Sequence, residues 1–170
     1  DIVEYFREKN VLTRYETGAI SSDEFIALIK KVAKNSISDA QIIEAWNAML
    51  LDYRKNTIDL LKRLKVNYRT FLLSNTNELH AKAFNQQLRK SYGISSLSGL
   101  FEKVYYSHVI GYSKPDKKAY QVVLDENKLI PEQTIFIDDR QENVDAAEKL
   151  GINGYNLLEN EDVCQIFSQF

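Results

Sequence analysis

The stretch Thr134-Ile135-Phe136-Ile137-Asp138-Asp139 decides the fold, because a short apolar run ends there in two adjacent carboxylates. Residues 134–137 have the length and composition of a buried strand, and 141–150 have the pattern of a helix closed by Gly151. Carboxylates at the carboxyl end of a parallel strand face the crevice where α/β proteins bind ligands. The pair therefore indicates a site for a hard cation such as Mg²⁺ or, less specifically, a cap for the following helix.

A second apolar run ends in a similar way. Phe71-Leu72-Leu73 leads directly into Ser74-Asn75-Thr76-Asn77, and a helix is expected from about Glu78. Hydroxyl and amide groups beside the free N–H groups of a helix N-terminus suit an anionic oxygen ligand. Ser and Asn are also ordinary helix caps, so this segment alone does not distinguish the two roles.

A third segment, Ser113-Lys114-Pro115-Asp116, contains a lysine next to a proline. Pro115 is expected in the first turn of a helix, which would place Lys114 just outside that helix. The ammonium group would then be a fixed point charge for a phosphate or for clustered carboxylates. The alternative is a solvated surface lysine.

From Lys55 onward, helix and strand patterns alternate along the chain. The expected strands are 70–73, 103–106, 134–138 and 154–158, and the expected helices are 58–64, 78–91, 116–127 and 142–150. This alternation predicts an α/β fold, with a Rossmann-like parallel sheet covered by helices on both faces. The strand ends then converge on one edge of the sheet. The residues expected to lie close together at that edge are Ser74, Lys114, Asp138 and Asp139.

Residues 1–54 are expected to form a small helical cap beside an α/β core over residues 55–170. Ser21-Ser22-Asp23-Glu24 and Ser38-Asp39-Ala40-Gln41 both have the pattern of a capping box at a helix start. An apolar stripe follows each start, which favours packing of these helices against each other. Roles as a substrate lid or as a dimer surface stay open.

Composition excludes several classes of partner. At 170 residues with 44% hydrophobic content, the chain is long enough for one compact domain with a small appendage. A net charge of −2, without a run of about 18 apolar residues, predicts no nucleic-acid or membrane partner. Cys164 is the sole cysteine, so an internal disulfide is excluded and a reducing, cytoplasmic location is expected. The oligomeric state is not determined by the sequence.

Taken in order, the three segments resemble motifs of the haloacid dehalogenase (HAD) superfamily of hydrolases. The segment 71–77 is similar to the second motif of that family, 114–116 to the third, and 136–139 with Glu142-Asn143 to the fourth. Tyr15-Glu16-Thr17-Gly18, followed by Ile20-Ser21, resembles part of the cap. The chain is most similar to the small sugar-phosphate phosphatases with a helical cap, of the glucose-1-phosphate phosphatase kind.

This resemblance implies Mg²⁺-dependent hydrolysis of small phosphate monoesters, such as sugar phosphates, through an aspartyl-phosphate intermediate. It assigns the metal to Asp139 and Asp138, with Asp138 alternatively orienting Lys114. It assigns phosphate binding to Ser74, Asn75 and Lys114, a catalytic role to Ser74 and Lys114, and a supporting position near the metal to Asn143. A metal-free dehalogenase is disfavoured because two uncompensated acids would repel its substrate. A sugar-phosphate mutase finds no particular support.

The first motif of the family, an Asp-x-Asp pair after an apolar strand, has no counterpart in the chain. In the family that motif carries the nucleophile and the acid/base, on a strand between those expected here at 70–73 and 134–137. Its removal would leave a gap of roughly 10 Å, or about two strand spacings. We therefore expect that the 170 residues lack this segment and are inactive alone. The alternative is a non-enzymatic module that binds a phosphate or a protein partner.

Overall fold

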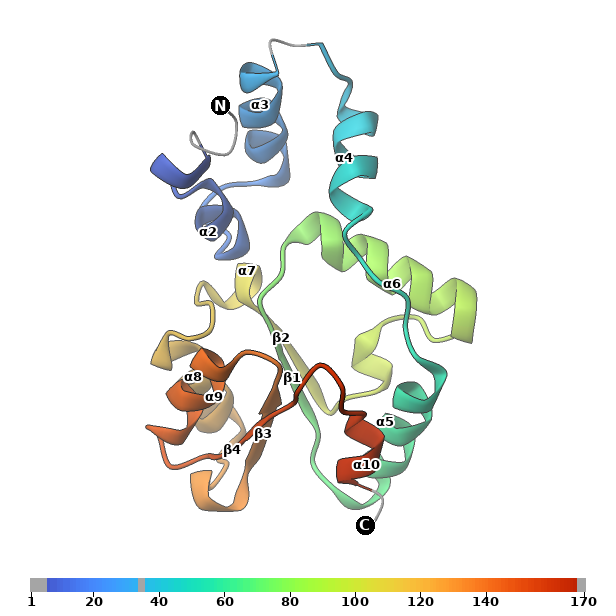
Figure 1. The fold of residues 1–170 in the computed structure, drawn as a ribbon, viewed down its shortest axis with the longest axis vertical. Helices are drawn as coiled ribbons and strands as arrows, with labels where there is room; N and C mark the ends of the chain where they lie inside the picture. Colours follow the sequence, from blue (N-terminus) through green and yellow to red (C-terminus); the bar gives the residue numbers. More distant parts are fainter. Residues whose placement is uncertain (1–5, 34–35, 168–170) are drawn as a thin grey trace.

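The computed structural model describes residues 6–33 and 36–167, and Figure 1 shows how their elements are arranged. The N-terminal part contains the helices α2 (Val11–Glu16), α3 (Ser22–Val32) and α4 (Asp39–Asn47). The remaining helices are α5 (Lys55–Asn67), α6 (Glu78–Tyr92), α7 (Ser107–Ile110), α8 (Lys117–Asn127), α9 (Gln141–Glu148) and α10 (Val163–Ile166), with short 3₁₀ turns η1 (Leu97–Gly99) and η2 (Pro131–Gln133). The strands are β1 (Phe71–Ser74), β2 (Lys103–Tyr106), β3 (Ile135–Asp138) and β4 (Asn153–Asn156). Among the described helices, none is both long and apolar enough to cross a bilayer.

The four strands form two parallel pairs, which confirms the predicted α/β class. β1 pairs with β2, so that Ser74 lies opposite Tyr106, and β3 pairs with β4, so that Asp138 lies opposite Asn156. Within the described residues, no hydrogen-bonded ladder joins β1 to β3. The expectation that these two strands are not direct neighbours is therefore confirmed, and the described sheet is interrupted at that place.

One hydrophobic cluster holds the two strand pairs in a common fold. Its buried members come from α8, α9 and the residue before β4, and both Leu73 of β1 and Phe136 of β3 pack against it. These members are Ala119, Tyr120, Leu124, Ala147 and Ile152. α8 contacts β1 and packs against α9, which in turn contacts β3 and β4. The strand ends of both pairs consequently face one edge of the molecule.

The start of α8 corrects one prediction. Pro115 was expected in the first helical turn, but it follows a cis peptide bond and lies in the turn before the N-cap residue Asp116. The Asp116 side chain accepts from the backbone N–H of Lys118 at 2.9 Å, so the aspartate supplies the cap and the helix begins at Lys117. Lys114 still lies just outside the helix, as predicted.

The helices α3 and α4 begin with the two predicted capping boxes. The Ser21 hydroxyl accepts from the Glu24 backbone N–H, while the Glu24 carboxylate accepts from the Ser21 N–H at 2.7 Å. Ser38 and Gln41 make the equivalent pair at the start of α4. At each helix start, the local sequence therefore provides partners for two backbone N–H groups.

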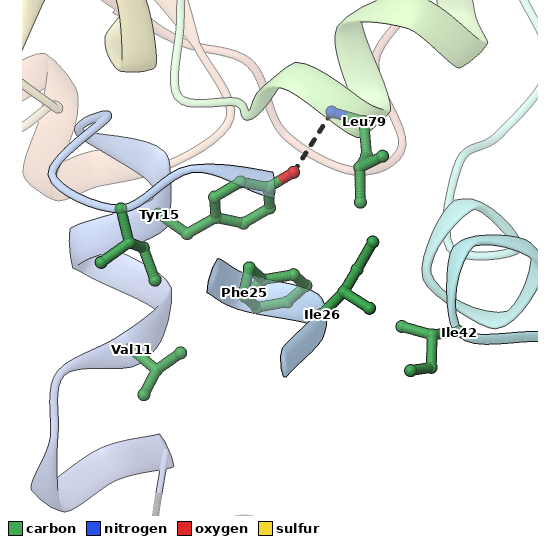
Figure 2. Close-up of a cluster of buried hydrophobic side chains, with 7 residues drawn as sticks. Val11, Tyr15, Phe25, Ile26, Ile42 and Leu79 are labelled. Atoms are coloured by element: carbon green, nitrogen blue, oxygen red, sulfur yellow. Dashed lines mark hydrogen bonds between the residues drawn. The ribbon is translucent and has the colours of Figure 1, made fainter. Parts of the chain in front are cut away.

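The helices α2, α3 and α4 pack together around a cluster that also includes a residue of α6. Figure 2 shows this cluster, whose buried members are Val11, Tyr15, Ile20, Phe25, Ile26, Ile42 and Leu79. The Tyr15 hydroxyl accepts from the Leu79 backbone N–H at 3.3 Å, and the Tyr15 ring stacks on Phe25 with centroids 4.2 Å apart. Because Leu79 lies beyond residue 54, helices α2, α3 and α4 rest on the start of α6, and the division into a cap over residues 1–54 and a core stays a prediction.

Candidate functional site

The segment after β1 is fixed to the segment before α8 by one side-chain amide. Asn75 Nδ2 donates to the Lys114 backbone oxygen at 2.8 Å, and Asn75 Oδ1 accepts from the Lys114 backbone N–H, also at 2.8 Å. This two-point contact sets the position from which the Lys114 side chain extends. Two of the three sequence motifs are thereby joined at the carboxyl edge of the strands.

The third motif joins them through a buried ion pair. Lys114 Nζ lies 2.6 Å from Asp138 Oδ2, and the two side chains are only 10% and 7% exposed. The other oxygen of Asp138 accepts from Asn143 Nδ2 at 2.8 Å and from the Arg140 backbone N–H at 2.9 Å. Asp138 thus accepts from Lys114, as the expectation that it orients this lysine requires.

These contacts keep Asp138 charged. Burial alone would raise the pKa of its carboxyl group, but the hydrogen bonds from Lys114, Asn143 and the Arg140 backbone outweigh burial and hold the pKa below its ordinary value. A buried carboxylate and a buried ammonium group therefore face each other as an ion pair. The Lys114 ammonium group is therefore a positive charge that the fold holds in a fixed position.

Ser74 and Asp139 are the two predicted site residues that adjoin this network in sequence. Ser74 ends β1 one residue before Asn75, and Asp139 follows β3 one residue after Asp138. Asp139 is exposed, unlike its neighbour. The structure thus places both at the strand ends where the network lies, with Asp139 open to solvent and to ligands.

The oxygen donors at this edge suit a hard cation in kind. Asn143 is 3% exposed, and its Oδ1 has no hydrogen-bond partner within the described chain. With Asp138 and Asp139, it offers the oxygen ligands that Mg²⁺ prefers, and Mg²⁺ sites use one or two carboxylates together with water and substrate phosphate. Groups of three or more acidic, His or Cys side chains that could hold a metal do not occur among residues 6–33 and 36–167. The residues therefore fit Mg²⁺ as part of a larger ligand set.

A second buried contact at this edge was not expected from the sequence. Ser107 is fully buried, and its hydroxyl accepts from the Thr76 N–H at 2.9 Å and donates to the Thr76 oxygen at 3.0 Å. His108 Nδ1 lies 3.1 Å from the same oxygen, and burial lowers the pKa of this imidazole. These contacts fix the loop after β1 to α7. The sequence alone does not predict these contacts, because they depend on the register in which β1 pairs with β2.

The first turn of α6 ties the cap to the loop after β1. Asn77 Oδ1 accepts from the His80 N–H at 3.0 Å and from Trp46 Nε1 at 3.2 Å, so its Nδ2 donates to His80 Nδ1. His80 Nε2 then carries the proton and donates to the Trp46 carbonyl oxygen at 3.0 Å. The imidazole also stacks on the Trp46 indole. Both ring nitrogens of His80 are therefore engaged in contacts within the chain.

The end of α2 lies directly against the backbone at this edge. Gly18 has a φ of 69°, and a Cβ added there would lie 2.3 Å from the backbone oxygen of His108. A hydrogen atom is therefore the only side chain that this approach permits. The contact brings the cap segment 15–18 next to the loop that follows β2.

The substitution Gly18→Ala is expected to destabilise the chain by about 2–4 kcal/mol, because a positive φ and a backbone clash both oppose the added methyl group. Gly93→Ala is the matched control, since Gly93 has a φ of 67° and nothing within 4 Å of an added Cβ. The control is expected to cost only about 1 kcal/mol. Urea unfolding of both variants measures the difference, and equal losses would show that α2 does not rest on α7.

Comparison with known proteins identifies the class that this geometry belongs to. The sequence model of the haloacid dehalogenase-like hydrolase family matches residues 4–151, so the chain belongs to the haloacid dehalogenase-like hydrolases. The resemblance found in the motifs is thereby confirmed.

Individual relatives are similar over most of the chain. D-ribitol-5-phosphate phosphatase of Bacteroides thetaiotaomicron is 23% identical over 150 residues, which cover 88% of this chain and 72% of that enzyme. A HAD family enzyme of the same organism, solved in complex with magnesium and inorganic phosphate, is 33% identical with a TM-score of 0.85 and covers 92% of this chain and 79% of that one. A predicted HAD-like hydrolase of Porphyromonas gingivalis is 28% identical with a TM-score of 0.86, covering 94% of this chain and 77% of that one.

Proposed function

We propose that the protein is a Mg²⁺-dependent phosphatase of small phosphate monoesters that reacts through an aspartyl-phosphate. The observation that carries this proposal is the buried Lys114–Asp138 ion pair, which Asn75 and Asn143 hold at the carboxyl edge of the strands. Family membership and a relative named as a sugar-alcohol phosphate phosphatase support the same reaction class. A similar structure that contains magnesium and phosphate supports the cofactor.

The residues of the site meet the demands of phosphoryl transfer. A phosphate monoester is a dianion, so catalysis has to gather positive charge around the transferred group and orient the nucleophile. Lys114 Nζ provides a fixed charge for the phosphoryl oxygens, while the Ser74 hydroxyl and the Asn75 backbone N–H donate hydrogen bonds to them. Bound Mg²⁺ would neutralise charge between the phosphate and an attacking carboxylate, with Asp139 as a direct ligand, Asp138 beside it and Asn143 in support.

The nucleophile of this mechanism is an aspartate outside the motifs found in the chain. No Asp-x-Asp pair follows an apolar run in the 170 residues, and β1 and β3 are not paired in the described structure. We propose that a strand between them carries this aspartate in the protein as its gene encodes it. The missing Asp-x-Asp also favours a second candidate, a non-enzymatic module that binds a phosphate or a protein partner at the same edge.

The proposed substrates are small phosphorylated metabolites, sugar phosphates or sugar-alcohol phosphates in particular. D-ribitol-5-phosphate, the substrate named for one relative, is the first compound to test. A cytoplasmic location agrees with the sole cysteine and with the intracellular nature of such metabolites.

A phosphatase assay on the protein as encoded tests the function. With Mg²⁺ present, hydrolysis of phenyl phosphate and of a sugar-alcohol phosphate is expected, and EDTA is expected to abolish it until excess Mg²⁺ is restored. Metal-independent hydrolysis would contradict the proposed mechanism. Phosphate binding without any turnover would favour the non-enzymatic module.

A further inference from the structure

Ser107, the first residue of α7, has a buried hydroxyl group with no assigned part in the proposed reaction. Its exposed fraction is 0%, and it lies directly after β2, beside the segment that leads from β1 to α6 (Figure 1). Its Oγ accepts from the Thr76 backbone N–H at 2.9 Å and donates to the Thr76 backbone oxygen at 3.0 Å. A single side chain therefore holds the peptide groups on both sides of the Thr76 Cα atom.

His108 adds a second donor to the same oxygen. Its Nδ1 lies 3.1 Å from the Thr76 backbone oxygen, and Nδ1 carries the proton of this contact because a carbonyl oxygen only accepts. The His108 ring stacks on the Tyr106 ring, with an angle of 12° between the two planes. Thr76 is only 5% exposed, so solvent has little access to these hydrogen bonds. The loop after β1 is thereby fixed to α7 through the backbone of one residue.

These contacts determine which groups of the loop are left for a ligand. The Thr76 N–H is occupied by Ser107, and the Asn75 side chain is occupied by the backbone of Lys114. Asn75 is therefore held at its own side chain and at the peptide bond that follows it. Its backbone N–H, the group proposed above to bind a phosphoryl oxygen, then has little freedom to change direction. Displacement of such a group by about 1 Å can lower the rate by about 10²-fold.

We propose that Ser107 is a positioning residue for phosphate binding, which fixes the peptide groups of Thr76 and thereby orients the Asn75 backbone N–H toward the phosphoryl group. This inference rests on the proposed phosphatase function and adds a residue that does not contact the substrate itself. Ser107 supports the loop after β1, whereas the proposed metal ligands Asp138 and Asp139 lie at the end of β3. Loss of the Ser107 hydroxyl is therefore expected to weaken phosphate binding more than Mg²⁺ binding.

Ser107→Ala removes this hydroxyl and leaves the buried Thr76 N–H without its partner. In the protein as encoded, with Mg²⁺ present, the substitution is expected to weaken binding of inorganic phosphate about 10-fold, measured by calorimetry, and to lower kcat/KM for phenyl phosphate about 10- to 100-fold. The Mg²⁺ concentration for half-maximal activity is expected to change less than about 2-fold. General damage to the fold would shift both quantities, so the difference between them distinguishes positioning from a purely structural role.

Ser22→Ala is the matched control. The Ser22 hydroxyl also has two hydrogen bonds, with the Tyr15 hydroxyl at 2.9 Å and with the Glu78 carboxylate at 2.6 Å, but it belongs to α3 and not to α7. The control is expected to lower the urea midpoint while changing phosphate affinity less than about 2-fold. An unchanged phosphate affinity in Ser107→Ala, or an equal shift for phosphate and Mg²⁺, would overturn the inference.

If Ser107→Ala does not fold, His108→Phe decides. This variant keeps a ring beside Tyr106, removes one donor to Thr76, and is expected to weaken phosphate binding about 3-fold, whereas unchanged affinity would overturn the inference. Phosphate binding is measured directly, so the test does not depend on turnover. Binding without turnover in the unaltered protein would contradict the proposed phosphatase function alone. The absence of phosphate binding in that protein would overturn both.

Discussion

Lys114→Ala is expected to lower turnover by about 10²–10³-fold, the usual loss when a preorganised electrostatic group is removed. It is also expected to cost about 3–5 kcal/mol of stability, because the substitution leaves the buried Asp138 carboxylate without its cation. Steady-state kinetics with phenyl phosphate and urea unfolding measure the two losses. Lys117→Ala is the matched control, since Lys117 is an exposed lysine three residues further along.

Asp139→Ala separates the two effects. Asp139 is exposed, so its removal is expected to leave stability within about 0.5 kcal/mol of the starting value. The proposed role at the metal predicts a comparable loss of turnover and a higher Mg²⁺ concentration for half-maximal activity. Equal rates in Asp139→Ala and in the unaltered protein would reject this role. A loss of turnover in Lys114→Ala without any loss of stability would contradict the buried ion pair.

A polypeptide limited to the 170 residues is expected to show no detectable phosphatase activity. Loss of the nucleophile in a covalent mechanism costs about 10⁶ in kcat, which lies below the detection limit of ordinary assays. The same polypeptide is expected to be less stable than the protein as encoded. In the described structure, no hydrogen-bonded ladder joins β1 to β3. Each buried backbone group that stays unpaired for this reason costs about 1–3 kcal/mol of stability.

Parallel assays of both forms test this expectation. Urea unfolding gives the stability difference, and phosphate release gives the rates. Comparable rates in the two forms would show that the nucleophile lies within the 170 residues. In that case the residues of the chain itself would have to be searched for a different nucleophile.

The parts of the fold that could be predicted depend on local physics. Apolar runs between helix patterns located the four strands to within two residues, and both capping boxes formed because the side chain and the backbone that each one joins are three residues apart. The placement of Lys114 beside Asp138 followed from parallel strands with polar residues at their carboxyl ends.

The unpredicted parts depend on contacts between distant residues. Ser107 holds Thr76 because β1 and β2 pair in a particular register, and nothing in residues 103–110 alone reveals that partner. The predicted position of Pro115 was wrong because the Asp116 side chain caps the helix. α8 therefore begins at Lys117, after the proline. The approach of Gly18 to the backbone of His108 is also a contact between segments about 90 residues apart, which no local pattern reveals.

Leu79 of α6 belongs to the same hydrophobic cluster as residues of α2, α3 and α4, so residues 1–54 cannot be exchanged between relatives without affecting this cluster. A chimaera that receives residues 1–54 from a relative would bring new partners to Tyr15 and Phe25 but keep the old first turn of α6. The donor cap would then meet a side chain at position 79 that was selected for a different surface. A graft that transfers residues 1–54 together with the first turn of α6 keeps the whole cluster from one parent, and it is therefore expected to fold more stably than a graft of residues 1–54 alone.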